Sequence, residues 1–166
     1  MCRTVICDTY NSADGDALAV FRRALLLFAD PANLPAVFHC HSGLDRTGLL
    51  SMLCLFAVGA TRAEIVADYS ATSTPEYSGT ARSQWLAHLH LPSIQELGEE
   101  KGSNMFLSDA STMEGLLEWL SDRFGGRPEA ILTSPQPRGL GLNRQQLSAL
   151  RAALKSTGDD AAGAKL

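Results

Sequence analysis

Residues 36–48 of the chain read AVFHCHSGLDRTG. The first part of this stretch, Ala36–His39, is a short apolar run that predicts a buried strand. A loop around Ser42–Asp45 follows, and the apolar run after it predicts a helix over Thr47–Val58 that ends at Gly59. The stretch therefore predicts a strand, a tight loop and a helix in direct succession.

A cysteine and an arginine frame this loop, and their chemistry suits a phosphate ligand. Backbone N–H groups that turn into a tight loop before a helix bind anions at the positive end of the helix dipole. The same field lowers the pKa of the Cys40 thiol, whose thiolate form is the nucleophile. Arg46 offers a planar fork that matches two phosphate oxygens. The loop therefore predicts a phosphate site that carries its own nucleophile.

The neighbouring residues fit the same hypothesis. Gly43 allows a turn conformation and a close approach of the backbone to a ligand. Thr47 can place its hydroxyl near the sulfur and ease the departure of the sulfur as a leaving group. His39 is expected to hydrogen-bond to the backbone around the loop and to fix its shape. The residues expected to contact phosphate are His41, Ser42, Gly43, Leu44, Asp45 and Arg46.

This loop resembles the signature of the protein tyrosine phosphatase superfamily, Cys-x5-Arg followed by Ser or Thr. It is most similar to the bacterial-type branch, whose loop reads HCxxGKDRTG and which includes tyrosine, dual-specificity and phosphoinositide phosphatases. Residues 34–38, 64–69, 112–114 and 117–120 also resemble that branch in order and spacing.

The resemblance implies an α/β cysteine-phosphatase-like fold in which a short sheet is packed by a mostly helical C-terminal half. It implies hydrolysis of a phosphotyrosine protein or similar phosphomonoester through a cysteinyl-phosphate intermediate. Neither a metal nor another cofactor is expected, because Arg46 and the loop already neutralise the phosphate.

The sequence departs from that branch in two places. Leu44 replaces the usual lysine, which weakens the inference to phosphoinositides and leaves a phosphoinositide phosphatase as an alternative. The part before Leu34 is short, and we expect part of the domain to be missing rather than reduced to a strand at Thr4–Tyr10 and one helix. We thus expect a domain over residues 1–155 with an incomplete sheet, a flexible tail at 156–166, and self-association through exposed apolar surface.

The general acid has two open interpretations. Asp45 matches a loop aspartate of the branch and could protonate the leaving oxygen, then activate water. It could equally be an acidic residue at a helix N-terminus that interacts with the dipole. Asp8, Asp14 and Asp16 are substitutes upstream, but each is better explained as a turn or cap residue.

Capping patterns and periodicity predict the remaining helices. A helix capped by Asp14 or Asp16 runs to about Ala29, a capping box at Thr61–Glu64 opens another, and Ser73 caps one that reaches His88. Leu91–Asp109 reads as a long connection or lid. A second capping box at Ser111–Glu114 opens a helix that ends at Gly125–Gly126, and shorter helices are predicted near Pro128–Leu132 and Asn143–Lys155.

Composition excludes several other classes. The chain has 166 residues, 45% of them apolar and 19% charged, which suits one globular domain. A formal charge of −4 gives no basic surface for nucleic acid or anionic membrane. No apolar run is long enough to cross a bilayer, and nothing at the N-terminus resembles a signal peptide. Four cysteines are too few for a disulfide scaffold and lack the spacing of zinc ligands. We expect a cytoplasmic protein.

Two rival functions remain. The short N-terminal part favours a non-catalytic phosphate-binding fragment, which would bind vanadate without turnover. A sulfur-transfer enzyme of rhodanese type also uses a loop cysteine at a helix start. The Arg46-Thr47-Gly48 ending speaks against this second rival.

Overall fold

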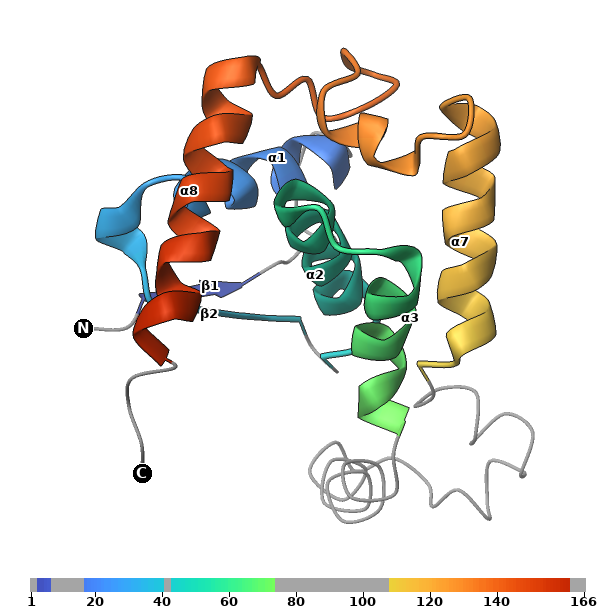
Figure 1. The fold of residues 1–166 in the computed structure, drawn as a ribbon, viewed down its shortest axis with the longest axis horizontal. Coiled ribbons are helices and arrows are strands. Elements are labelled where there is room, and N and C mark those ends of the chain that lie inside the picture. The colour runs from blue at the N-terminus through green and yellow to red at the C-terminus, as the bar shows by residue number, and fades with distance from the viewer. Residues whose placement is uncertain (1–2, 7–16, 41–42, 74–107, 162–166) are drawn as a thin grey trace.

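The computed structural model describes residues 3–6, 17–40, 43–73 and 108–161. The described chain is mostly helical, with two short strands (Figure 1). In chain order its elements are β1 (Arg3–Ile6), α1 (Ala17–Phe28), η1 (Pro31–Asn33), β2 (Ala36–His39), α2 (Asp45–Val58), α3 (Arg62–Ser70), η2 (Ala71–Ser73), α7 (Ala110–Arg123), η3 (Pro128–Leu132) and α8 (Arg144–Ala161), where η marks a 3-10 helix.

The two strands pair in parallel, with Arg3 opposite Ala36 and Ile6 opposite His39. A parallel pair needs a crossover, and α1 provides it between the strands. The strand predicted at Thr4–Tyr10 is confirmed as far as Ile6, and residues 7–10 lie outside the described residues. Val37 in β2 is 53% exposed, so part of the surface of this strand is open to solvent. Self-association through this surface stays a prediction.

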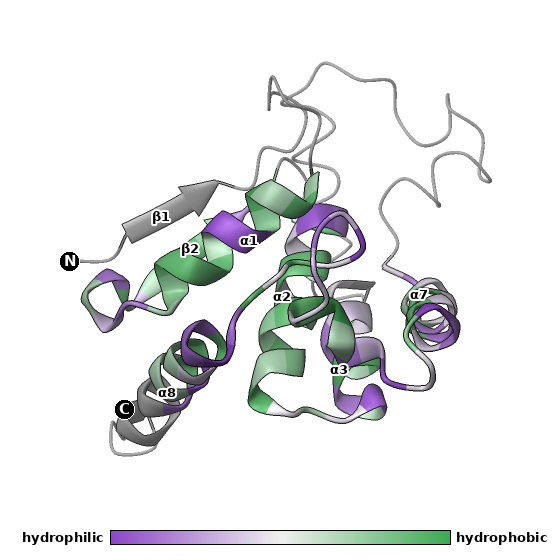
Figure 2. Ribbon diagram, turned by 90° about the horizontal axis from the view of Figure 1, so that it is seen from above, coloured by the Kyte–Doolittle hydropathy of each residue, from purple (hydrophilic) through white to green (hydrophobic). Residues whose placement is uncertain are grey.

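Helix α2 is the centre of the described structure. It packs against β2, α3, α8 and η3, and Figure 1 shows it between α8 and α3. Figure 2 shows it as hydrophobic over most of its length. Leu50, Leu53 and Ala57 are buried along one face, while Met52 and Phe56 are buried along another. A helix that buries two faces is held in position from both sides, so the loop before it has a fixed support.

Both ends of α2 follow from local backbone conformation. The helix ends at the predicted Gly59, whose φ of 86° is left-handed and whose N–H donates to the carbonyl oxygens of Leu55 and Phe56. It begins at Asp45, two residues before the predicted Thr47, because the backbone of Leu44 already has right-handed helical angles. Asp45 and Arg46 therefore lie in the first turn rather than in the loop.

One predicted capping box is confirmed and the other is wrong. At the start of α3, Thr61 Oγ1 accepts from Glu64 N at 3.3 Å and Glu64 Oε2 accepts from Thr61 N at 2.7 Å. At the start of α7 the cap is Asp109, whose Oδ1 accepts from Ser111 N at 3.1 Å. Aspartate caps as well as serine does and also interacts favourably with the helix dipole, so α7 starts at Ala110, before the predicted box at Ser111–Glu114.

The other helices agree with the sequence to different extents. α1 and η3 lie where helices were predicted, whereas Asp14 and Asp16 are outside the described residues. The predicted helix from Ser73 to His88 and the predicted lid also fall outside them, apart from Ser73 in η2 and residues 108–109. α8 continues through Ala161, beyond the predicted end at Lys155, and the flexible tail expected at 156–166 stays a prediction. Extending a formed helix costs little, since each added residue gains a hydrogen bond.

Gly48 in α2 provides a test of the packing between α2 and α3. A Cβ atom at Gly48 would lie 2.5 Å from Cδ2 and 2.6 Å from Cε2 of the Tyr69 ring, which is buried and cannot move freely. We expect Gly48→Ala to lower the free energy of unfolding by about 1–3 kcal/mol, as overpacking does. Urea denaturation measures this change.

Gly115 in α7 is the matched control. A Cβ atom there meets no atom within 4 Å, so Gly115→Ala should stabilise the helix by up to about 1 kcal/mol through propensity alone. The close packing of Tyr69 on Gly48 is contradicted if both alanine variants shift the urea midpoint upward.

Candidate active site

Cys40 stands at the junction between β2 and α2. It directly follows the last residue of β2 and lies five positions before the first residue of α2, and its side chain is only 5% exposed. The sequence produces this placement through the apolar strand Ala36–His39 on one side and the buried helix on the other. The thiol is thus held close to the N-terminal end of a helix, where the dipole favours negative charge.

Hydrogen bonds fix the backbone of Cys40 on both sides. Its N–H donates to Thr47 Oγ1 at 2.9 Å, which ties the end of the strand to the first turn of α2. Its carbonyl oxygen lies 3.2 Å from His39 Nδ1, a hydrogen bond that requires the proton on Nδ1. His39 and Thr47 therefore make the backbone contacts around the loop that a fixed loop shape requires.

The surroundings of the Cys40 thiol change its pKa in opposite directions. Burial is the largest single influence and raises the pKa, because a charged sulfur loses solvation. The Thr47 hydroxyl, the backbone N–H groups of Thr47 and Gly43, and the charge of Arg46 lower it. Together they outweigh burial and bring the pKa below the ordinary value of 9.0. The site therefore favours a thiolate in spite of its burial.

Position 43 requires glycine because of its backbone conformation, and not because a larger side chain would lack space. Its φ is +73°, in the left-handed region that favours glycine, whereas a Cβ atom there would meet nothing within 4 Å. The backbone N–H of this residue is one of the groups that lower the pKa of the Cys40 thiol. Leu44, the next residue, is half-buried and makes no side-chain cap for α2.

The structure brings three of the predicted site residues together around the thiol. Gly43, Arg46 and Thr47 all act on Cys40, and Arg46 is half-buried. Asp45 is exposed in the first turn of α2. His41 and Ser42, which were expected to contact phosphate, lie outside the described residues.

Tyr69 is a residue next to the site, and the sequence indicated it only as the last residue of the stretch 64–69 that resembles the phosphatase branch. Its side chain is 7% exposed, and its ring packs on Gly48. Burial raises the pKa of the Tyr69 phenol, and the carboxylates of Asp45 and Asp109 raise it further. Tyr69 therefore lies within electrostatic reach of one carboxylate in the first turn of α2 and of another at the N-cap of α7. The glycine directly after Arg46-Thr47 is the one sequence signal for a close neighbour at this point.

The described ends of the chain on either side of residues 74–107 meet beside Tyr69. The fully buried Ser108 hydroxyl forms a hydrogen bond with the Thr72 hydroxyl, which lies 3.2 Å from the Tyr69 carbonyl oxygen. This contact fixes the end of η2 and the start of α7 relative to each other, next to the first turn of α2.

Residues 3–6, 17–40, 43–73 and 108–161 hold no group of three or more His, Cys, Asp or Glu side chains that could bind a metal ion. Among the helices that the structure describes, none combines the length and the apolar character of a bilayer span.

These features define a class of site: a helix start that lies next to a thiol of lowered pKa and carries a guanidinium group whose charge acts on the sulfur. A family model for the tyrosine phosphatase family matches residues 3–156, and the chain belongs to that family. The search of curated proteins found no match. The search of solved structures found none either.

Family membership supports a phosphatase function in general terms and implies a phosphorylated substrate. The mostly helical chain with its short strands is consistent with a phosphatase-like α/β fold at a coarse level.

Proposed function

We propose that the chain is a cysteine-dependent phosphomonoester hydrolase of the protein tyrosine or dual-specificity type, with Cys40 as the nucleophile. The observation that carries this proposal is the position of Cys40 between β2 and α2, where its N–H donates to Thr47 Oγ1 at 2.9 Å and the groups around its sulfur lower the pKa of the thiol. A thiol that serves only to fill the core would have its pKa raised by burial. Here four contacts from the loop and the helix start overcome that effect.

In the first step the Cys40 sulfur forms a bond to phosphorus and the ester P–O bond breaks. The leaving oxygen needs a proton, and we assign its supply to Asp45, which would start as the carboxylic acid and end as the carboxylate. The exposed position of Asp45 in the first turn of α2, next in sequence to Arg46, supports this assignment. The products are an alcohol or phenol and a cysteinyl-phosphate.

In the second step water attacks phosphorus and the S–P bond breaks. The Asp45 carboxylate takes a proton from the water, inorganic phosphate leaves, and Cys40 returns to the thiolate. Thr47 serves this step because its hydroxyl already interacts with the sulfur and would stabilise the departing thiolate. The acid and the nucleophile are then both restored for the next cycle.

Arg46 and the loop N–H groups would bind the transferring phosphoryl group in both steps. The charge of Arg46 reaches the Cys40 sulfur, so it acts where the phosphorus must lie. Its planar fork matches two phosphate oxygens and offsets their charge in the transition state. Positive charge from a side chain and from backbone dipoles performs in this way what a metal ion performs in other phosphatases.

The substrate assignment rests on the composition of the loop. Leu44 brings no charge to the site, which favours a substrate with one phosphate, such as phosphotyrosine, over a multiply phosphorylated inositol lipid. We further infer one cysteine-phosphatase-like domain over residues 1–155, and the family match over residues 3–156 supports this extent.

Hydrolysis of para-nitrophenyl phosphate by the purified chain, with chelator present, tests the proposed function. We expect turnover that tolerates the chelator and is faster on a phosphotyrosine peptide than on a phosphoinositide. A folded chain that binds vanadate and shows no turnover on any of the three substrates would overturn the proposal in favour of a phosphate-binding fragment.

A further inference from the structure

We propose that the chain carries a second binding site, for a small organic acid, in a cavity at the end of α2 opposite to Cys40. This site is separate from the proposed catalytic loop. α2 has 14 residues, which corresponds to about 20 Å of helix between its two ends. The inference does not depend on the proposed phosphatase chemistry.

Residues from the C-terminal end of α2 and from α3, α7, η3 and α8 line the cavity. Its volume is about 510 Å³, and pockets that hold small molecules measure roughly 300–1,000 Å³. Phe56 of α2 and Leu117 of α7, both buried in the core, supply apolar wall. Five elements from separate parts of the chain therefore line an open cavity that is large enough for a small organic molecule.

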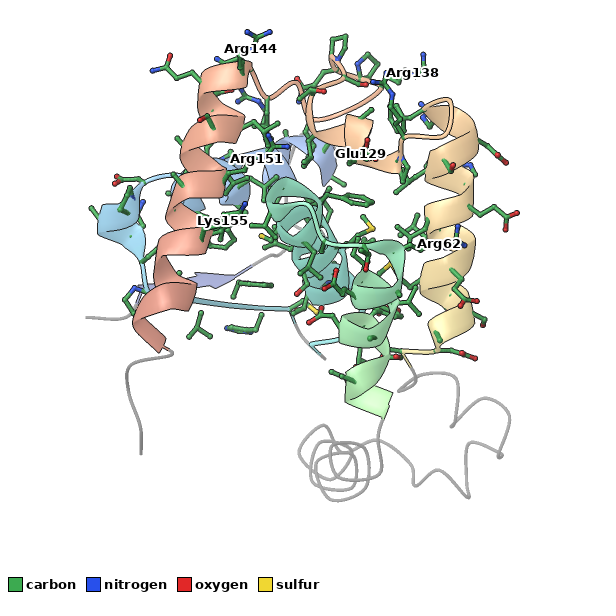
Figure 3. All side chains as sticks on the ribbon, viewed as in Figure 1. Arg62, Glu129, Arg138, Arg144, Arg151 and Lys155 are labelled. Carbon is green, nitrogen blue, oxygen red and sulfur yellow. The ribbon has the colours of Figure 1, made fainter. Side chains whose placement is uncertain are left out.

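Charged groups line the same cavity. Arg62 at the start of α3 and Arg151 of α8 carry two positive charges, against one negative charge on Glu129 of η3. Figure 3 shows Arg151 and Arg62 on different helices, with Glu129 between them in that view. The lining therefore has a surplus of positive charge, although the whole chain has a formal charge of −4.

Hydrogen bonds to the backbone hold both guanidinium groups. Arg151 Nε donates to the Ala57 carbonyl oxygen at 2.6 Å, and Arg62 Nη2 donates to the Glu114 carbonyl oxygen at 3.0 Å. Each of these bonds uses one nitrogen of a group that has five N–H donors on three nitrogens. The side chains are thus positioned in advance, which lowers the entropy cost of binding a ligand.

The chemistry of the lining specifies the class of ligand. Guanidinium groups match the planar oxygens of carboxylates and the oxygens of phosphates. The apolar wall of Phe56 and Leu117 suits an aromatic or hydrocarbon part in the same molecule. An organic carboxylate or phosphate with an apolar portion satisfies both requirements. The negative charge of the exposed Glu129 repels a bound anion and so lowers the affinity of the site for it.

The proposal is tested by titrating the full chain, labelled with nitrogen-15, with phenylacetate and following backbone amide shifts by NMR. We expect saturable amide shifts for residues around the cavity, including Gly59 and Gly126. The amides of residues 43–48 should show no saturable shift over the same titration. Removing one guanidinium in Arg151→Gln or Arg62→Gln should weaken binding on the order of fivefold. Arg144→Gln on the same α8 helix, outside the cavity lining, is the matched control and should leave the Kd unchanged.

A second variant keeps the test decisive even where the loss of the Arg151 bond to Ala57 loosens α2. Removal of the opposing charge in Glu129→Gln should tighten binding of phenylacetate on the order of threefold, whereas Glu118→Gln on α7 should not. A partly unfolded chain cannot bind more tightly, so this gain is specific to the site. The proposal is overturned if Glu129→Gln leaves the Kd unchanged, if saturable shifts map to residues 43–48 instead, or if no shift saturates.

Discussion

Replacing Cys40 with serine is expected to reduce hydrolysis of para-nitrophenyl phosphate to background, a loss of roughly 10³-fold or more. The contacts around Cys40 lower the pKa of its thiol below 9.0. A serine hydroxyl in the same place stays protonated in this pH range and is a poor nucleophile. The fold should survive, because the bond from the Cys40 N–H to Thr47 Oγ1 involves the backbone and not the sulfur. Steady-state kinetics and circular dichroism measure the two effects.

Cys54→Ser is the matched control for this variant. Cys54 lies within α2 and is half-buried, away from the first turn of the helix. A serine there puts a hydroxyl in an apolar neighbourhood and should lower stability by about 1–3 kcal/mol without abolishing turnover. Residual activity of Cys40→Ser close to that of the unsubstituted chain would exclude Cys40 as the nucleophile.

Replacing Arg46 with methionine should lower kcat on the order of 10³-fold, about 4 kcal/mol of transition-state stabilisation. Arg46 is the one side chain whose positive charge acts on the Cys40 sulfur among the residues the structure describes. Its removal eliminates the positive charge that would offset the negative charge of the phosphoryl oxygens. It also raises the pKa of the Cys40 thiol and so lowers the fraction of thiolate. Methionine keeps much of the length and the apolar stem, so packing changes little.

Two further variants separate charge from geometry at this position. Arg46→Lys keeps the charge and loses the planar fork, so kcat should fall less than in Arg46→Met and remain well below the unsubstituted value. Arg23→Met removes an exposed arginine of α1 and should leave kcat unchanged. Equal activity of Arg46→Met and Arg23→Met would contradict a role for Arg46 in phosphate binding.

The strand, the loop and the central helix were predictable because their signals are local. An apolar run of strand length, a glycine in the loop and a glycine at the helix end each act within a few residues of where they stand. The capping box at Thr61–Glu64 is local in the same sense, and the structure confirms it. The second predicted box, at Ser111–Glu114, was wrong because Asp109 lies two residues upstream and caps the helix instead. The Asp109 side chain accepts a hydrogen bond from the Ser111 N–H.

Features that depend on distant segments could not be predicted in this way. Tyr69 interacts with the carboxylates of Asp45 and Asp109, which are far from it in sequence, and only the packing of three helices brings them together. The cavity at the end of α2 likewise needs Arg62 and Arg151 from separate helices. Periodicity placed these residues on helices, but periodicity alone does not specify which faces meet.

The proposed role of Cys40 as the nucleophile requires a thiol that ionises readily beside the start of α2. The rate of Cys40 alkylation, measured as a function of pH, tests this requirement. The rate of reaction with iodoacetamide follows the thiolate fraction, so a lowered pKa moves the midpoint of the rate profile to lower pH. Mass spectrometry resolves Cys40 from Cys54, and inorganic phosphate should slow the reaction at Cys40 alone. We predict a midpoint for Cys40 below 9.0 in the folded chain, rising in Thr47→Val as the hydroxyl contact is lost. A midpoint at or above 9.0 in the folded chain would contradict the account.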